Sequence, residues 1–206
     1  MGCVVKRNVK IMGDIIRGFK GCTSILDLGC SRGGKLKKVC DALQIKGLGV
    51  DADPAIVEIA RESSLMKVIL GDIMKSDKLF ADNSFDGVMI TDVLEHFDTS
   101  DAIWLAKQAM RIAKKAVVAT IPIETAPRQF PGKWQEHKSL WTTKTISQLW
   151  EGKALIFHDK SFHERLALKG GPERHAQIKR DHHQGRSFPE WTICYVRFDI
   201  PVEKLM

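Results

Sequence analysis

A short segment near the start of the chain combines an apolar run, an acidic residue and three glycines. Residues 25–34 read Ile-Leu-Asp-Leu-Gly-Cys-Ser-Arg-Gly-Gly. The glycines permit a tight turn and let the backbone approach a ligand closely. The free N–H groups at the start of a following helix bind anionic groups. Asp27, the acid of this segment, is suited to a neighbouring ammonium group. The segment therefore predicts a ligand-binding turn that favours a cationic group.

Two kinds of cofactor use such a turn. A dinucleotide fingerprint requires G-x-G-x-x-G, whereas the same register here holds Gly29, Ser31 and Gly34. Asp27 is also poorly suited to a neighbouring pyrophosphate. S-adenosylmethionine, which carries an ammonium group, a cationic centre and an adenosine, fits the segment better. An NAD(P)-dependent oxidoreductase on the same kind of sheet is the alternative.

The elements that must position this turn alternate in type from residue 24 onward. Short apolar runs indicate strands, and apolar residues at helical spacing indicate helices. We expect strands at 24–28, 46–50, 67–70, 85–90, 115–121, 154–157 and 191–200, and helices at 35–43, 54–64, 100–113 and 143–150. This alternation predicts an α/β fold of parallel βαβ units with right-handed crossovers. Residues 191–200 show the alternation of a long strand, with Cys194, Val196, Phe198 and Ile200 on one face, and we expect this last strand to be antiparallel.

The sequence indicates one domain with an N-terminal helix. Residues 5–19 show an amphipathic helical stripe, so we expect residues 1–22 to form a helix that docks on a single domain at 23–206. Within that domain, 23–122 is the predicted cofactor-binding half and 123–206 the substrate-side half. The regions 124–140 and 162–190 contain the Pro and Gly residues that are typical of long loops.

Four motifs, in the right order and spacing, resemble those of the class I S-adenosylmethionine-dependent methyltransferases. The subgroup they resemble is the quinone-biosynthesis type, also described as methyltransferase-11-like. The motifs are residues 27–33 (motif I, D-x-G-x-G-x-G, with Ser31 at the second glycine), 49–54 (the acidic post-I motif), 71–73 (the adenine segment), and 85–88 with 92–97 (the fourth-strand motif). The resemblance covers about residues 24–122. It implies a Rossmann-like, doubly wound, mostly parallel sheet of seven strands with helices on both faces.

The resemblance also implies a cofactor, S-adenosyl-L-methionine, which leaves as S-adenosyl-L-homocysteine, and a set of residues that contact it. Asp27 would pair with the amino group of the methionine moiety. Asp51 would accept hydrogen bonds from both ribose hydroxyls, and Asp72 would accept one from the adenine amine. The full predicted set is Asp27, Gly29, Cys30, Ser31, Gly33, Asp51, Ala52, Asp72, Ile73, Asp92 and Val93. Asp92 and Val93 would close the pocket near the sulfonium.

Methyl transfer needs alignment, and it needs a general base where the acceptor carries a proton. The candidates for that base are His96, His137 and Asp92. After the fourth predicted strand there is no N/D-P-P-Y/F sequence, and the chain has no Pro-Cys pair. These absences disfavour two specialised chemistries, adenine or glutamine amino methylation and cytosine C5 methylation. They leave an oxygen, nitrogen or carbon acceptor open, either a small molecule or a macromolecule.

Composition narrows the class of protein further. The 206 residues carry a formal net charge of +7 and five Cys without a C-x-x-C pair. The cysteine usage predicts reduced thiols and a cytoplasmic location. The sequence has no run of about 18 apolar residues, so we expect no membrane span. No apolar region follows Lys6 and Arg7, so we expect no secretory signal.

The region 160–190 is basic and could bind a polyanion. A non-catalytic nucleic-acid-binding module is thus a second alternative. We predict no metal site, because the adjacent histidines at 182 and 183 are a weak signal.

Overall fold

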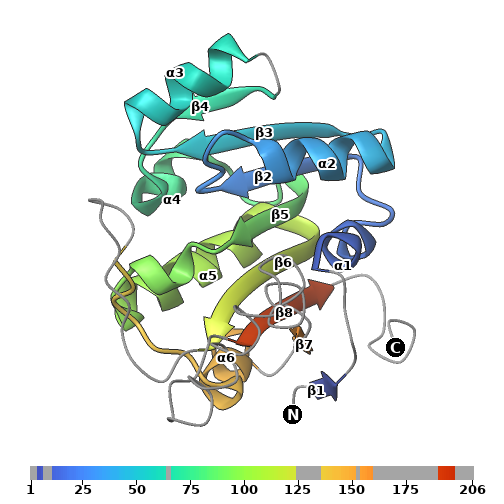
Figure 1. Ribbon diagram of the computed structural model, residues 1–206, viewed down its shortest axis with the longest axis vertical. Helices are drawn as coiled ribbons and strands as arrows, with labels where there is room; N and C mark the ends of the chain where they lie inside the picture. Colours follow the sequence, from blue (N-terminus) through green and yellow to red (C-terminus); the bar gives the residue numbers. More distant parts are fainter. Residues whose placement is uncertain are drawn as a thin grey trace, which may run out of the picture.

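The computed structural model describes residues 4–6, 11–63, 66–123, 136–151, 154–159 and 190–197. Within these residues one eight-stranded sheet runs in the order β1-β7-β8-β6-β5-β2-β3-β4, as Figure 1 shows from bottom to top. The strands are β1 (Val4–Lys6), β2 (Ser24–Leu28), β3 (Lys46–Asp51), β4 (Val68–Leu70), β5 (Phe85–Thr91), β6 (Ala113–Ile123), β7 (Leu155–Asp159) and β8 (Glu190–Arg197).

The strand pairing confirms a mostly parallel sheet with a late antiparallel strand. β8 is antiparallel to both β6 and β7, whereas the other neighbouring strands in the described sheet are parallel. From β2 the chain builds outward through β3 to β4, and it then returns to place β5 on the other side of β2. The strand order therefore reverses between β2 and β5. In sheets of this kind ligands bind at this reversal, beyond the carboxyl ends of the strands.

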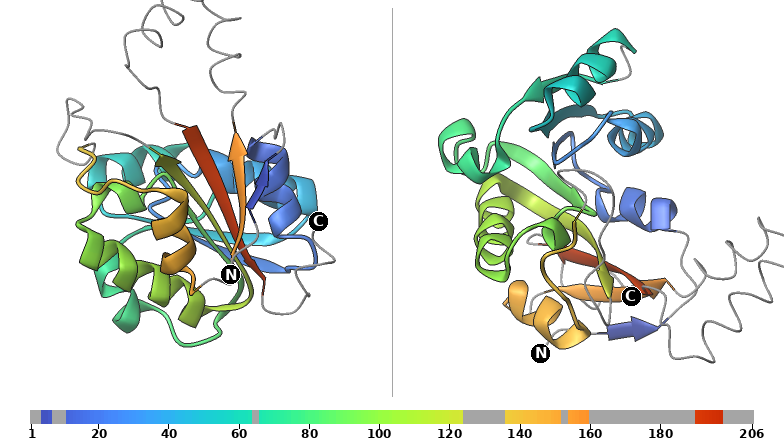
Figure 2. Two further views of the ribbon diagram at one scale, coloured as in Figure 1. Left: turned by 90° about the horizontal axis from the view of Figure 1, so that it is seen from below. Right: turned by 60° about the vertical axis from the view of Figure 1, so that its left-hand side comes forward.

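Helices cover both faces of the sheet (Figures 1 and 2). The helical segments are α1 (Ile11–Gly18), α2 (Gly34–Leu43), α3 (Pro54–Glu62), η1 (Ile73–Lys75), α4 (Ser76–Leu79), η2 (Leu94–His96), α5 (Thr99–Ile112) and α6 (Thr143–Leu149). Helices α2, α3, α5 and α6 lie where the four helices of the domain were predicted. The short segments η1, α4 and η2 were not predicted, because a single turn is too short to show helical periodicity.

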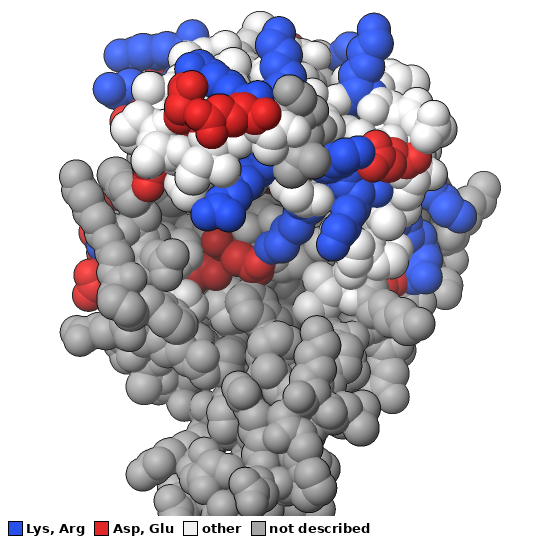
Figure 3. Space-filling model, turned by 45° about the horizontal axis from the view of Figure 1, so that its top comes forward, with Lys and Arg blue, Asp and Glu red and all other residues white. Residues whose placement is uncertain are grey.

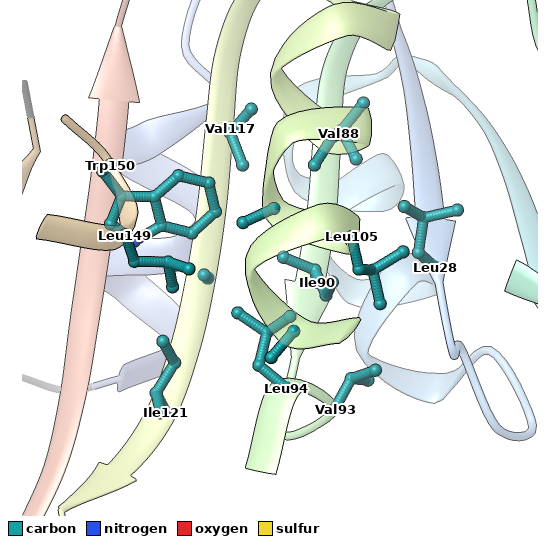
Figure 4. Packing of buried hydrophobic residues seen from close by; sticks show 14 of the residues in the cluster. Leu28, Val88, Ile90, Val93, Leu94, Leu105, Val117, Ile121, Leu149 and Trp150 are labelled. Carbon is teal, nitrogen blue, oxygen red and sulfur yellow. The ribbon is translucent and has the colours of Figure 1, made fainter. Parts of the chain in front are cut away.

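Two hydrophobic clusters lie on opposite faces of the central strands. Along β2, Ile25 packs in the cluster under α1 and α2, whereas Leu26 and Leu28 pack in the cluster under α5 and α6. This is the two-residue period of a strand, and all three side chains are fully buried. In the second cluster Trp150 lies next to β6, and α5 lies over β5 (Figure 4). A strand that is buried on both faces accounts for the continuous apolar run at 25–28.

The N-terminal helix packs closely against the centre of the sheet. Phe19, just after α1, is fully buried, and a Cβ on Gly87 of β5 would lie 2.6 Å from its ring. Gly87 thus makes room for Phe19. Helix α1 therefore packs on the sheet. None of the helices in the described ranges is long and apolar enough to span a membrane.

Two expectations about the N-terminal region are wrong in detail. The helix begins at Ile11 rather than at residue 5, and Val4–Lys6 form a strand that pairs in parallel with β7. The described sheet therefore has eight strands instead of seven. The β-branched pair Val4 and Val5 favours a strand, and β7 offers unpaired backbone groups to it. A short apolar run cannot by itself be assigned to a helix or a strand.

Candidate functional site

The turn between β2 and α2 holds three residues in the left-handed region of backbone space. Gly29, Ser31 and Gly33 have φ values of 74°, 50° and 76°. The N–H groups of Gly29 and Cys30 both donate to the carbonyl oxygen of Val50, at 2.9 and 3.0 Å. The turn is thereby joined to the end of β3. Left-handed φ explains the glycines at 29 and 33 and leaves Ser31 strained.

Gly29 is required by the packing of the protein itself. A Cβ at this position would lie 2.7 Å from Cγ2 of Val93, and Val93 is buried. The Cys30 side chain is also buried, against Gly49 of β3. Burial raises the pKa of the Cys30 thiol, with Asp27 and Asp51 adding to the increase. Cys30 is therefore a packing residue whose backbone, rather than its thiol, borders the turn.

Asp27 lies in β2 with only 1% of its surface exposed. Burial raises its pKa to about 7; Lys35 opposes this increase, and Asp51 and Asp92 add to it. Among the described residues, Oδ1 of Asp27 has no hydrogen-bond partner. An unpaired buried acceptor is costly. A hydrogen-bond donor from outside the described residues would satisfy this oxygen.

Asp92, at the end of β5, is fixed by two partners. Thr120 donates from Oγ1 to Oδ1 of Asp92 at 2.6 Å, and Lys35 forms an ion pair with Oδ2. Asp92 also has a left-handed φ of 59°. Lys35 and Thr120 are absent from the predicted site. The signal that could have identified Lys35 is its place in the first turn of the helix that follows the glycine-rich turn.

Asp51 joins the turn to the next motif. Its Oδ2 accepts from the Ser31 N–H at 2.8 Å, and its Oδ1 accepts from the Asp53 N–H at 3.0 Å. Its backbone carbonyl accepts from Gly71 at 2.9 Å, which brings the predicted adenine segment next to it. Ala52, between Asp51 and Asp53 in the chain, is exposed. Asp53 caps α3 by accepting from Ala55 N–H at 2.9 Å, which is the structural role expected of an acid before proline.

Asp72 and Ile73 differ in their surroundings. Oδ1 of Asp72 accepts from the Met74 N–H at 2.9 Å and so caps η1, while its side chain is 48% exposed. Ile73 is buried in the cluster that contains Leu28 and Val50. Asp72 thus has free surface for a ligand beside its capping role. Ile73 contributes mainly to the core that supports the site.

The structure brings the two candidate histidines together. The rings of His96 and His137 lie edge to face, with centroids 5.0 Å apart. Nδ1 of His96 lies 3.1 Å from the carbonyl oxygen of Glu136. Burial lowers the pKa of His96, and His137 lowers it further, against the opposing effects of Glu136 and Asp92. His96 is therefore neutral at pH 7 and able to accept a proton.

An open cavity of about 630 Å³ lies at the other end of the sheet. It is lined by Ser24, Lys46 and Phe85, which are the first residues of β2, β3 and β5. Ligands of doubly wound sheets bind at the opposite, carboxyl ends of the strands. The acidic residues described above lie at those carboxyl ends. We therefore place the candidate site there and not in this cavity.

Comparisons with known proteins bear on the fold and on the kind of domain that it forms. A family model described as "Methyltransferase domain" matches residues 25–116, which contain β2 to β5 and the turns around the site. No curated protein sequence matches this chain.

Several solved structures share the fold. A SAM-dependent methyltransferase from Archaeoglobus fulgidus has 21% identity and a TM-score of 0.66, with 91% of each chain covered. A putative sarcosine dimethylglycine methyltransferase from Galdieria sulphuraria has 16% identity and a TM-score of 0.61, covering 91% of this chain and 84% of that one. Phosphoethanolamine N-methyltransferase 2 of Haemonchus contortus, in complex with S-adenosyl-L-methionine, has 14% identity and a TM-score of 0.68, covering 91% and 52%.

The family model assigns residues 25–116 to a methyltransferase domain, and the solved structures show that the chain has the fold of S-adenosylmethionine-dependent methyltransferases. The Archaeoglobus fulgidus protein is SAM-dependent and the Haemonchus contortus protein is in complex with S-adenosyl-L-methionine, in agreement with the cofactor that the sequence motifs predict. This finding favours a transferase over the NAD(P)-dependent alternative. The basic region at 160–190 lies outside the described residues, apart from Glu190 at the start of β8.

Proposed function

We propose that this chain transfers a methyl group from S-adenosylmethionine to an oxygen, nitrogen or carbon acceptor, with the cofactor bound beyond the carboxyl ends of β2, β3 and β5. The observation that carries the proposal is the buried Asp27 carboxylate, whose Oδ1 lacks a partner among the described residues. An ammonium group donates a hydrogen bond to such an acceptor, and its positive charge favours the ionised form of the carboxylate. The amino-acid end of the cofactor supplies one.

Charges of both signs meet at this point. The effects of Lys35, Asp51 and Asp92 on the pKa of Asp27 show that these groups lie within electrostatic reach of it. The amino-acid end of the cofactor is a zwitterion. Asp27 would hold its ammonium group and Lys35 would pair with its carboxylate, while Lys35 keeps Asp92 in place from the other side. A nucleoside without the amino-acid end would lose both interactions.

Asp51 is the proposed ribose ligand. Each of its carboxylate oxygens accepts one backbone N–H bond, from Ser31 and Asp53. Each oxygen has further acceptor capacity, so the carboxylate can also accept the two neighbouring hydroxyls of a ribose. The two backbone bonds fix the orientation of Asp51 before the ligand arrives. Such preorganisation lowers the entropy cost of binding.

The reaction asks the protein mainly for alignment and for exclusion of water. When bound, S-adenosylmethionine supplies a methyl group that its sulfonium already activates. Asp27 would anchor the amino-acid end of the cofactor and Asp51 its ribose, and Val93 would close the pocket between them. Asp92 is disfavoured as a base, because Thr120 and Lys35 engage its two oxygens. His96 and His137 are the two base candidates that still fit.

A negatively charged acceptor is consistent with the charge of the chain. The net charge is +7, and Lys and Arg side chains lie along the upper side of a hollow that contains a smaller group of acidic side chains (Figure 3). This basic surface belongs to the described residues, so the idea of a polyanionic acceptor does not depend only on the region 160–190. Electrostatic attraction would raise the association rate of such an acceptor and would weaken with salt.

Calorimetric titration with S-adenosylhomocysteine and with 5′-methylthioadenosine, which lacks the amino-acid end, tests the proposal. We expect binding of S-adenosylhomocysteine, weaker binding of 5′-methylthioadenosine, and a loss of this difference in Asp27→Asn. Asp41→Asn is the matched control, because Asp41 lies on α2 but is exposed and paired with Lys37. No binding at millimolar ligand would overturn the proposal. Salt-dependent RNA or DNA binding that survives Asp51→Ala would then favour the non-catalytic alternative.

The acceptor itself needs an unbiased assay. Methyl-tritiated cofactor and the full chain are incubated with fractionated cell extract, and label is counted in small molecules, RNA, protein and lipid. Transfer that depends on Asp51 identifies the acceptor class. Label in no fraction, with normal cofactor binding, would contradict the catalytic part of the proposal.

A further inference from the structure

Three side chains with metal-ligating atoms converge beside the proposed methyl-transfer site. Glu95 and His96 come from η2, and His137 comes from the segment that follows β6, far away in the sequence. One ligand atom from each residue can be chosen so that all three lie within 4.8 Å of one another. Ligands at about 2.0–2.2 Å around one ion lie within this range of each other. The spacing therefore fits a single ion after small side-chain adjustments.

The orientation of His96 favours a ligand role. Its Nδ1 lies 3.1 Å from the Glu136 carbonyl oxygen. A carbonyl only accepts, so this bond assigns the ring proton to Nδ1 and leaves the lone pair on Nε2. Metal-binding histidines commonly donate their other ring N–H to a backbone carbonyl in this way. The hydrogen bond fixes both the tautomer and the direction of the ring.

Backbone hydrogen bonds hold the two segments of the cluster against each other. The N–H groups of Lys138 and Ser139 donate to the Glu95 carbonyl oxygen at 2.8 and 3.2 Å. The Ser139 hydroxyl donates to the Leu94 carbonyl oxygen at 3.2 Å, and the Trp141 indole donates to the same hydroxyl at 2.8 Å. The segment around His137 is thus positioned on η2 by three hydrogen bonds, and the Trp141 bond holds the Ser139 hydroxyl in place; none of the four involves the ligand atoms.

The cluster is also shielded from bulk water. Glu95 is 1% exposed and His137 is 7% exposed, whereas His96 is half-buried and forms the open side. Electrostatic attraction between a carboxylate and a cation is much stronger in such surroundings than at the surface. This cluster therefore differs from the exposed acidic groups that many proteins carry without any ion, because two of its three residues are buried.

We propose that Glu95, His96 and His137 bind one divalent transition-metal ion. Two imidazole nitrogens and one carboxylate oxygen suit Zn²⁺, Mn²⁺, Fe²⁺ or Co²⁺ better than Ca²⁺ or Mg²⁺, which prefer oxygen ligands alone. Three protein ligands leave coordination positions for water or for an oxygen of a bound molecule. With the ion in place, His96 and His137 are ligands and are not available as general bases. The motif spacing gave no sign of this set, because His137 comes from a distant segment.

Metal binding by the full, untagged and chelator-treated chain tests the proposal directly. Zn²⁺, Mn²⁺ and Mg²⁺ are each titrated in competition with a chromophoric chelator, and Co²⁺ is followed by its visible absorption. We expect one tight site for Zn²⁺ and Co²⁺, weaker binding of Mn²⁺ and no tight binding of Mg²⁺. The Co²⁺ spectrum should indicate nitrogen and oxygen ligands without thiolate bands.

Variants separate this cluster from other histidines. His96→Asn and His137→Asn should each weaken Zn²⁺ binding by at least about 100-fold, more than the loss of an outer-shell partner usually costs. The matched control is the double variant His182→Asn/His183→Asn, which changes a histidine pair outside the described residues and should keep the tight site. Tight binding lost in the control and kept in His96→Asn would overturn the proposal, as would a wild-type chain without a tight site.

A parallel titration distinguishes this inference from the proposed function. S-adenosylhomocysteine binding is measured on the metal-free wild type and on each variant. Retained binding shows that the variants are folded, so a lost metal site cannot be attributed to unfolding. If the cofactor product binds and no metal does, the metal inference fails while the methyltransferase proposal stands.

Discussion

Lys35, in the first turn of α2, forms an ion pair with Asp92 at the end of β5. The pair spans the point where the strand order reverses, between the glycine-rich turn and the fourth-strand motif. Lys35 also opposes the increase in the pKa of Asp27. One lysine thus compensates two carboxylates from different parts of the sheet.

Replacement of Lys35 by Met should raise the pKa of Asp27 further, since the opposing positive charge is removed. We expect Lys35→Met to weaken S-adenosylhomocysteine binding by about 1–3 kcal/mol near neutral pH and to move the rise of affinity with pH to higher pH. Calorimetry across a pH series measures both effects. Lys37→Met, on the same helix and paired with Asp41, is the control. Equal effects in the two variants would show that only the charge of the helix matters.

Replacement of Asp27 by Asn should stabilise the ligand-free protein at high pH. The folded-state pKa of Asp27, about 7, is above its ordinary value of 3.8. The folded state therefore holds the proton more tightly, and wild-type stability falls as the pH rises from about 4 to about 7. Asp27→Asn removes this loss, which is on the order of a few kcal/mol. Thermal unfolding at about pH 5 and about pH 8 checks it; an advantage of the variant that is larger at the lower pH would contradict the prediction.

Asp51 and Asp53 should separate ligand binding from stability. Asp51→Ala should weaken S-adenosylhomocysteine binding by about 1–3 kcal/mol, because a charge-assisted hydrogen bond to the ribose is lost. Asp53→Ala removes the cap of α3 and should lower the free energy of unfolding by about 1 kcal/mol with little change in affinity. Calorimetry and urea denaturation of both variants give the comparison. If Asp53→Ala lost as much affinity as Asp51→Ala, the assignment of Asp51 to the ribose would be undermined.

Ser31→Gly should increase stability, since Ser31 has a left-handed φ of 50°. We expect a gain of up to about 1 kcal/mol, partly offset by the greater freedom of glycine in the unfolded chain. Cofactor binding should persist, because the Ser31 contact with Asp51 uses the backbone N–H. Urea denaturation of wild type and variant decides the sign, and a destabilised variant would mean that the hydroxyl has a role of its own.

Gly29 and Val93 should behave as a coupled pair. A Cβ at Gly29 would clash with Val93 at 2.7 Å and would be strained by the φ of 74°. Gly29→Ala should therefore lower the free energy of unfolding by about 2 kcal/mol or more. The double variant Gly29→Ala/Val93→Ala should lose less than the sum of the two single variants. Strict additivity in a double-mutant cycle would show that the steric contact is not the cause.

Much of the fold was predictable because its signals are local. The run at 25–28 follows from the burial of both faces of β2, the alternation after Glu190 is typical of a strand, and both strands form where expected. The strand at Val4–Lys6 was not predictable, since its pairing with β7 is decided by an edge that forms late in the chain. Single turns such as η2 were missed for lack of any periodicity.

The sequence by itself determined the class of fold, the position of the glycine-rich turn and the order of the acidic residues along the chain. These depend on residue type and short spacing, and local backbone preference enforces them. Only the tertiary structure decided which side chains meet: Lys35 with Asp92, Gly29 with Val93, and Glu95 and His96 with His137. Such contacts join strands and loops that are distant in sequence, so the packing of the sheet and its helices, rather than any local pattern, fixes them.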